Sequence, residues 1–311
     1  MLLLAISSAS AQAKASSIII SILKGPSGIA ATWMLAAPPD TGNVKLEFLY
    51  AGSADLVTAK LISGEIAAGV LPVNVAAKLH ASGIPLKVVA VVGNGMVKFL
   101  SVDPSVSSLG QLKGSTIHIA GQRATPDYLF RYLMAEEGLV SGKDYFPQYN
   151  LAFPEVASQI AAKKITHAVL PEPFATQALS LNPSLRSPID LDALWKGATP
   201  FETYPMSLLV SMPQLYEKNP QALTALTEAY AVSVGKTNAF PRETGILAES
   251  FDLGMKAAIA QKAIPNSAYV FDRSARSRSS IDALLGIFIS FDPQSIGGRM
   301  PSDSFYSLLT P

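Results

Sequence analysis

Short apolar runs alternate along this chain with longer segments whose apolar residues recur at helical spacing. Six of these runs end in a turn rich in glycine, proline, serine or asparagine and lead directly into a helix-like segment. This order of strand, turn and helix is typical of parallel sheets covered by helices. The strand-like runs are 18–23, 44–49, 66–71, 115–120, 149–153 and 165–170.

The six turns predict helix N-termini along one edge of the sheets. Proline opens several of the helices, and serine or threonine precedes others, because the first backbone N–H groups of a helix lack partners within it. We expect Ser27, Ser53 and Thr125 to cap helices in this way. Such turns lie at the carboxyl ends of parallel strands, where open α/β sheets bind ligands.

The runs fall into two groups of three, which predicts two lobes. Between the groups, residues 93–95 place two glycines and an asparagine between two strand-like runs, so the chain can leave one sheet and enter another. A second extended crossing is predicted at 199–216. We expect one lobe from 17–93 plus 213–311 and the other from 96–212, with a ligand cleft between them.

Composition agrees with this organisation. The chain has 311 residues, which favours two cores over one, and no internal apolar run is long enough to span a membrane. Lys and Arg number 24 against 23 Asp and Glu, without a basic stripe, so nucleic acid is not an expected partner. The serine-rich basic segment 272–280 is predicted to be a solvated helix start.

Residues 1–13 resemble the remnant of a signal peptide. Apolar residues precede Ala11-Gln12-Ala13, which fits a cleavage site before Lys14, although no basic residues come before the leucines. The chain has no cysteine, which excludes disulfides, thiol nucleophiles and a lipid-modified cysteine. We therefore expect a periplasmic protein that is not lipid-anchored.

Candidate ligand contacts come from the six turns and the crossings. For each of them, a purely structural role in capping or packing is the alternative. Asn74 offers a donor and an acceptor, Asn94 sits in the predicted hinge, and aromatic rings would suit a flat ligand. The expected contacts are Pro26, Ser27, Ser53, Ala54, Pro72, Asn74, Asn94, Gln122, Arg123, Thr125, Glu172, Phe174 and Tyr204.

Two charged candidates leave alternatives open. Arg123, beside a helix start, could bind a carboxylate, sulfonate or phosphate, or could form a surface or interlobe salt bridge. Glu172, between two prolines, could accept hydrogen bonds from an amine or pyrimidine, or could simply favour the helix N-terminus. The two side chains could also pair with each other.

No catalytic or metal-binding set is predicted. His80, His118 and His167 are too widely spaced for a metal pattern, and the last two are expected to be buried within strands. The chain shows no catalytic triad, phosphate-binding loop or dinucleotide fingerprint. We expect no cofactor and no enzyme activity.

Several segments together resemble a known family. "LKGPSGIAA", "AGVLPVNVAAKLHASGIPLKVVAVV", "LGQLKGSTIHIAGQRATPDYLFRYLMAEEGL", "HAVLPEPFATQAL" and "FDPQSIGGRMPSDSFY" are similar to substrate-binding proteins of ABC importers. The likeness is to the nitrate/taurine/sulfonate and thiamine-pyrimidine-like superfamily and covers 17–311. It implies an α/β, two-lobed type II periplasmic binding protein fold: two mostly parallel sheets flanked by helices and joined by two crossing strands.

The resemblance also implies a function. We expect a monomeric solute-binding component that captures a small metabolite by hinge closure and delivers it to ABC permease subunits. A sulfonate or a vitamin precursor is a candidate ligand. One alternative is an enzyme of the same fold acting on a pyrimidine or futalosine-type substrate, although the cysteine-rich motif of thiamine-pyrimidine synthases is missing. Another is the ligand-sensing domain of a regulator.

Overall fold

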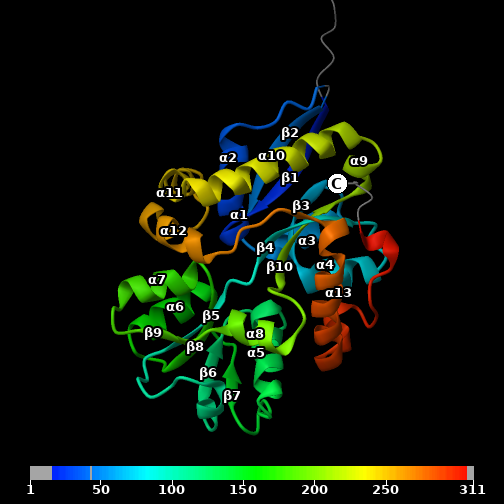
Figure 1. Cartoon of the computed structure of the whole chain (residues 1–311). Coiled ribbons are helices and arrows are strands. Elements are labelled where there is room, and N and C mark those ends of the chain that lie inside the picture. Colours follow the sequence, from blue (N-terminus) through cyan, green and yellow to red (C-terminus); the bar gives the residue numbers. More distant parts are fainter. Residues whose placement is uncertain (1–15, 43, 307–311) are drawn as a thin grey trace, which may run out of the picture.

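A computed structural model of the chain describes residues 16–42 and 44–306. The expected signal peptide lies outside these residues. Two lobes are stacked one above the other, each built around its own sheet (Figure 1). The predicted fold class is confirmed: each lobe is α/β, with helices flanking a sheet.

A six-stranded sheet forms the core of the first lobe, in the order β11-β4-β10-β3-β1-β2. β1 pairs in parallel with β2 and β3, while β10 lies antiparallel between β3 and β4. The sheet therefore contains β10, which comes from the segment expected in the second lobe. The strands are β1 (Ser16–Leu23), β2 (Val44–Ala51), β3 (Ala68–Pro72), β4 (Lys87–Asn94), β10 (Pro205–Ser211) and β11 (Asp272–Arg273).

A five-stranded sheet forms the core of the second lobe, in the order β7-β6-β8-β5-β9. β6 is parallel to β7 and β8, and β5 is antiparallel to β8 and β9. Both sheets are thus mixed and not mostly parallel as expected, because β10 and β5, which follow the crossings, run antiparallel to their neighbours. The strands are β5 (Val97–Ser101), β6 (Thr116–Ile119), β7 (Phe146–Gln148), β8 (His167–Pro171) and β9 (Arg186–Ile189).

One predicted strand is wrong. The run at 149–153 forms no strand, and its last residue, Phe153, instead begins a helix with Pro154 in the first turn. Proline suits this position because its fixed φ is already helical and the N–H it lacks would have no helical partner. The short β7 precedes this run and takes the expected place in the sheet.

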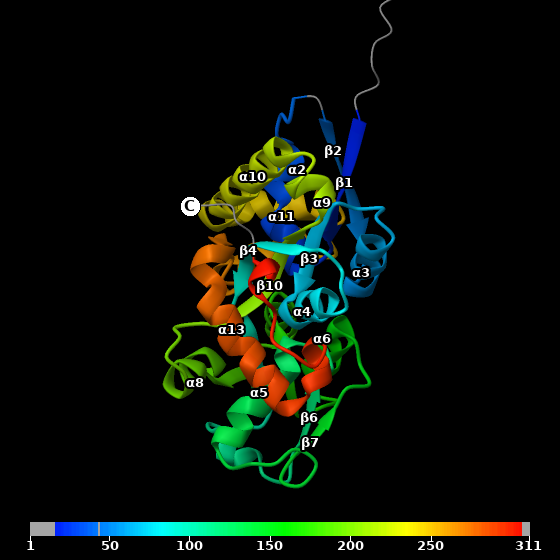
Figure 2. The same ribbon diagram turned by 90° about the vertical axis from the view of Figure 1, so that its right-hand side faces the viewer.

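Helices cover both sheets, and the long C-terminal helix α13 runs down from the first lobe beside α5 of the second (Figure 2). The first lobe contains α1 (Pro26–Ala30), α2 (Thr32–Ala36), α3 (Ala54–Ile62), α4 (Val73–Ala81), α9 (Pro213–Tyr216), α10 (Pro220–Ala239), α11 (Pro241–Ser250), α12 (Ala257–Ala263) and α13 (Ser274–Phe291). The second contains α5 (Thr125–Glu136), α6 (Phe153–Ala161), α7 (Phe174–Leu181) and α8 (Leu191–Ala198). Single 3-10 turns are η1 (Leu109–Leu112), η2 (Ile264–Asn266), η3 (Pro293–Ile296) and η4 (Asp303–Phe305).

The two crossings between the lobes are bonded to each other. Gly95 N, between β4 and β5, donates to Thr203 Oγ1 at 3.0 Å. Any side chain at Gly95 would collide with its neighbours, since an added Cβ would lie 2.6 Å from Asp192 Oδ1. The glycine therefore allows the close approach that holds the crossings together.

Apolar packing continues from one lobe into the other. A single cluster of buried side chains includes Leu71 of β3, Met96 of the first crossing and Phe99 of β5. Among the residues described, no helix combines the length and apolarity that crossing a membrane would need.

Candidate functional site

The interlobe boundary brings α4 of the first lobe against the start of α5 in the second. Asn74, the second residue of α4, is only 4% exposed. Its Nδ2 donates to the backbone oxygen of Arg123 at 2.9 Å, across the boundary. Its Oδ1 is buried and has no hydrogen-bond partner. One end of this amide thus joins the lobes while the other remains available.

The turn before α5 holds three of the predicted residues. Arg123 has a left-handed backbone, with φ of 58°, and its N–H donates to Asp127 Oδ2 at 2.9 Å. Thr125 begins α5 and is 1% exposed, and its hydroxyl has no partner. Gln122 is exposed. The boundary therefore contains a second buried polar group without a partner, two residues from the Asn74 contact.

Two of the three expected helix caps are wrong. Ser53 does cap α3, since its side chain accepts a hydrogen bond from Leu56 N at 3.3 Å. Thr125 lies inside α5, and the acceptor at this helix start is the carboxylate of Asp127. Ser27 lies inside α1, where its hydroxyl bonds back to Leu23 O at 3.4 Å. Both residues already have helical backbones, which places their side chains past the capping position.

Arg123 extends toward the first lobe. Its Nε lies 4.0 Å from Asp292 Oδ2, and its side chain is 76% exposed. The same carboxylate oxygen accepts a hydrogen bond from Tyr128 OH at 3.0 Å. Arg123 thus pairs with Asp292 across the lobes, and its neighbour there is not Glu172.

These residues belong to a larger contact, which we call the interlobe seam. The seam consists of Arg123, Tyr128 and Arg131 on the second lobe and Phe288, Phe291 and Asp292 on the first. The rings of Tyr128 and Phe288 lie 4.7 Å apart, and the guanidinium of Arg131 lies 5.1 Å from the ring of Phe291. Burial, with the Asp292 carboxylate beside it, raises the pKa of Tyr128 to about 12.

Glu172 follows β8 and is 2% exposed. Its N–H donates to Met96 O in the first crossing at 2.8 Å, and its Oε2 accepts from Thr176 N at 2.9 Å. The Glu172 carboxylate therefore accepts a hydrogen bond from the first turn of α7, in agreement with the expectation that it favours a helix N-terminus. Burial raises the pKa of its carboxyl.

Tyr269 of the first lobe lies within electrostatic range of Glu172. It is buried, and its hydroxyl has the Ser267 side chain of the same lobe beside it. Its pKa is raised, mainly by burial and to a smaller extent by the charge of Glu172. The adjacent residue, Ala268, accepts a hydrogen bond from Asn94 N at 3.1 Å, which ties this segment to the end of β4.

The remaining predicted residues divide between the boundary and the core. Pro26 opens α1, and Pro72 ends β3 two residues before Asn74. Ala54 begins α3, directly after the exposed Ser53. Phe174 is half-buried and stacks on Phe153, with 5.4 Å between ring centroids. Tyr204 is fully enclosed: its hydroxyl accepts from Val97 N at 3.4 Å and its ring packs on Trp195. Tyr204 thus supports the crossings from within.

Several residues of this region escaped the sequence analysis. Asp127 could have been found as an acid in the first turn of a helix. Tyr128 and Asp292 could not, since they are 164 residues apart in the chain and no local pattern links them. Tyr269 follows a helix and no strand, so it lies outside the repeated motif.

Two cavities lie away from the boundary. One of about 360 Å³ is lined by the amino-terminal ends of β6 and β8, including His118, Lys164 and His167. The other, of about 230 Å³, lies between the end of α4 and the C-terminal segment, beside His80 and Arg299. Within the part of the chain that the structure describes, no three His, Cys, Asp or Glu side chains are grouped as a metal site.

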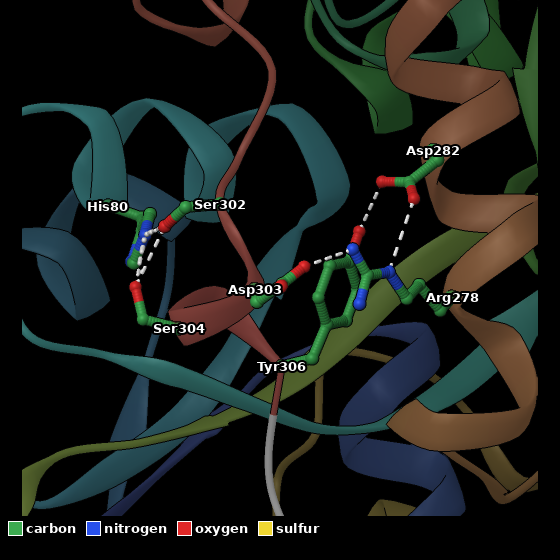
Figure 3. Close-up of polar contacts among 7 residues, drawn as sticks. All are labelled: His80, Arg278, Asp282, Ser302, Asp303, Ser304 and Tyr306. Carbon is green, nitrogen blue, oxygen red and sulfur yellow. Dashed lines mark hydrogen bonds and ion pairs between the residues drawn. The ribbon is translucent and has the colours of Figure 1, made fainter.

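The C-terminal segment holds His80 in a polar cluster (Figure 3). His80 Nε2 lies 3.3 Å from both Ser302 Oγ and Ser304 Oγ. On the other side of the segment, Tyr306 OH donates to Asp282 Oδ1 of α13 at 2.5 Å. The segment therefore connects α4 to α13, and α13 also contacts α5 of the second lobe.

Comparison with solved structures identifies similar proteins. An ABC transporter protein from Parabacteroides distasonis is 27% identical, with a TM-score of 0.82 over 95% of this chain and 100% of that one. The periplasmic aliphatic sulphonate binding protein SsuA from Escherichia coli is 15% identical, with a TM-score of 0.69 over 92% of each chain. The periplasmic nitrate-binding protein NrtA from Synechocystis PCC 6803 is 12% identical, with a TM-score of 0.67 over 90% of this chain and 82% of that one.

Neither a protein-family model nor a curated protein sequence matches the chain. The structural neighbours are nevertheless ABC transporter binding proteins, as the resemblance in the sequence predicted. They are not enzymes, and they share the type II periplasmic binding protein fold with this chain.

Proposed function

We propose that this chain, which has the type II fold of ABC transporter binding proteins, is the extracytoplasmic solute-binding component of an ABC importer. It captures a small metabolite between its lobes and presents the closed form to a permease. The protein acts as a periplasmic monomer. The neighbours support the solute-binding role in general, and the details are our proposal.

One observation carries this proposal. Asn74 Oδ1 and Thr125 Oγ1 are buried polar atoms without partners, and they come from opposite lobes at the same contact. A buried polar group without a hydrogen bond is unfavourable by about 1–3 kcal/mol, so such groups call for an explanation. A bound solute that hydrogen-bonds to both lobes would satisfy them and favour closure.

Closure would be a rotation about the two crossings. Few residues link the lobes there, and the hydrogen bond between Gly95 and Thr203 keeps the crossings side by side. An open form would separate Asn74 from Arg123 and expose both helix starts to solvent. A ligand that contacts both lobes stabilises the closed form by its differential affinity for that form.

The first test is whether a solute binds at all. Native mass spectrometry of freshly purified protein would reveal a co-purifying small molecule, and a thermal-shift screen would cover sulfonates and vitamin precursors. A reproducible ligand with one molecule per chain supports the proposal. A protein with no co-purifying solute that is stabilised by no compound in the screen contradicts it.

Thr125→Val then tests the site. Valine keeps the shape and removes a buried hydroxyl that has no partner in the free protein, so the unfolding free energy should rise, by up to about 1–3 kcal/mol. Affinity for the solute should fall about tenfold, because one hydrogen bond is lost. Isothermal titration calorimetry and urea unfolding would measure the two effects.

The matched control is Thr227→Val. Thr227 is equally buried, but its hydroxyl bonds to Leu223 O at 2.7 Å within α10. This variant should lose stability and keep its affinity. Equal affinities of the wild type and Thr125→Val would remove Thr125 from the site.

A further inference from the structure

The polar side chains buried at the interlobe boundary are rich in hydrogen-bond acceptors. Glu172 and Asp127 are buried carboxylates, and Asn74 presents its carbonyl oxygen. Asp127 already accepts from Tyr149 OH at 2.8 Å and from Arg123 N. Glu172 accepts from Thr176 N, and a carboxylate has room for further donors. A solute at this boundary would therefore meet the unpartnered Asn74 Oδ1 and a Glu172 carboxylate that can accept further hydrogen bonds.

Cations that border the same region are already engaged. Lys98 Nζ lies 3.0 Å from Asp192 Oδ2, and Arg123 pairs with Asp292 while most of its side chain faces solvent. Arg131 lies over the rings of Tyr128 and Phe291 in the interlobe seam. An anion placed beside Glu172 would thus face like charge in a buried environment, where Coulomb repulsion is weakly screened.

Glu172 is well placed to distinguish ligands by charge. Its backbone is fixed to the first crossing at Met96, and two residues earlier Asn94 N donates to Ala268 O of the first lobe. The carboxylate is therefore held where the two lobes meet around the hinge. A donor bound there would contact the second lobe through the carboxylate of Glu172.

We infer that the interlobe site selects a solute that donates hydrogen bonds, either a cation such as an amine or amidine or a neutral N–H-rich compound, over an oxyanion. This inference rests on the proposed function and specifies the ligand class of the same site. It separates this chain from the neighbours whose names specify a sulphonate or nitrate, although the folds agree.

Pairs of probes with the same shape and opposite charge test the inference. Benzamidinium and benzoate are one pair, and acetamidinium and acetate are another. The full chain should be stabilised in thermal-shift and calorimetric titrations by an amidinium and not by the matching carboxylate. Benzenesulfonate and nitrate complete the set as the oxyanions of the neighbours. Tighter binding of any of these anions than of the amidinium probes overturns the inference and leaves the proposed function intact.

The variant Glu172→Gln identifies the residue responsible. It keeps the shape and removes the charge, so amidinium affinity should fall about tenfold or more, while the weak binding of benzoate should improve. Glu137→Gln is the control, since Glu137 is exposed at the end of α5 in the same lobe. Equal loss in both variants, or no loss in Glu172→Gln, contradicts the assignment.

The charge of a co-purifying solute tests the ligand class independently of the probes. If neither probe pair binds, the charge of the solute found by native mass spectrometry settles the ligand class: a cation or neutral donor supports the inference and an oxyanion overturns it. If no solute and no probe binds, the proposed function fails, and the inference fails with it.

Discussion

Burial keeps the histidines of this chain neutral. The pKa values of His80, His118 and His167 are all lowered, in each case mainly by desolvation of the ring. His167 is buried and its Nδ1 lies 3.1 Å from Ser101 Oγ, as the sequence predicted, while His118 is half-buried with an Nδ1 that has no partner. Their neutral forms are part of the folded state.

Acid should therefore weaken the fold through His80. In the unfolded chain a histidine takes up its proton near pH 6.5, and in the folded chain His80 does so at lower pH. Below about pH 6.5 the unfolded state binds more protons, so the unfolding free energy falls as pH decreases toward the folded pKa. Urea unfolding between pH 7.5 and 5 would measure this loss.

His80→Gln isolates the contribution of this one ring. The variant has no imidazole beside Ser302 and Ser304, so its stability should depend less steeply on pH over the same range. An unchanged pH dependence would show that the other titrating groups account for the effect.

Close packing of α11 against α12 leaves no room for a side chain at Gly245. An added Cβ at Gly245 would lie 2.5 Å from the backbone oxygen of Ala257, at the start of α12. Backbone atoms cannot rotate away as a side chain can, so Gly245→Ala should lower the unfolding free energy by about 1–3 kcal/mol. Urea unfolding would measure the difference from wild type.

Gly235 provides the opposite case within α10. It is exposed, and an added Cβ would meet no atom within 4 Å. Gly235→Ala should raise the unfolding free energy by about 0.5–1 kcal/mol, because alanine loses less conformational entropy in a helix. The same sign of change in both variants would contradict this explanation.

The local sequence pattern predicted where helices and strands begin better than it predicted which strands lie side by side in a sheet. Proline and small residues marked most helix starts, as at α1, α3 and α4, because these signals act within one turn of chain. The place of β10 between β3 and β4 could not be predicted, since its hydrophobic pattern suits either sheet.

In the candidate site, too, residues marked by local pattern could be predicted and residues brought in by tertiary packing could not. Asn74, Arg123, Thr125 and Glu172 were found because they follow strand ends, where α/β sheets bind ligands. Asp292 approaches from a distant part of the chain, and only tertiary packing brings it to the boundary. The sequence also could not show that Tyr204 is enclosed, because an aromatic beside a crossing is equally compatible with core and site.

The interlobe seam should control how far the lobes open. Tyr128→Phe keeps the ring on Phe288 and removes the hydrogen bond to Asp292, which crosses the boundary. A hydrogen bond to a charged group contributes about 1.5–3 kcal/mol, so its loss should shift the unliganded protein toward open forms by about tenfold or more. Spin labels at Glu137→Cys and Lys218→Cys would report lobe separation, since the chain has no cysteine of its own.

Tyr306→Phe is the matched control for the seam. Its hydroxyl also donates to a carboxylate, that of Asp282, but both residues belong to the first lobe (Figure 3). This variant should leave the distance distribution unchanged. A distribution that is identical in the wild type and Tyr128→Phe would show that the seam does not hold the lobes together.

The position of β10 also determines which of the two sheets can be completed first during synthesis of the chain. The second sheet uses a continuous stretch and has all its strands once Ile189 is available. The first sheet begins at Ser16 but lacks its inner strand until Ser211, and its edge strand until Arg273. The N-terminal half-sheet must therefore wait for residues from the far end of the chain, and the lobe that starts first is finished last.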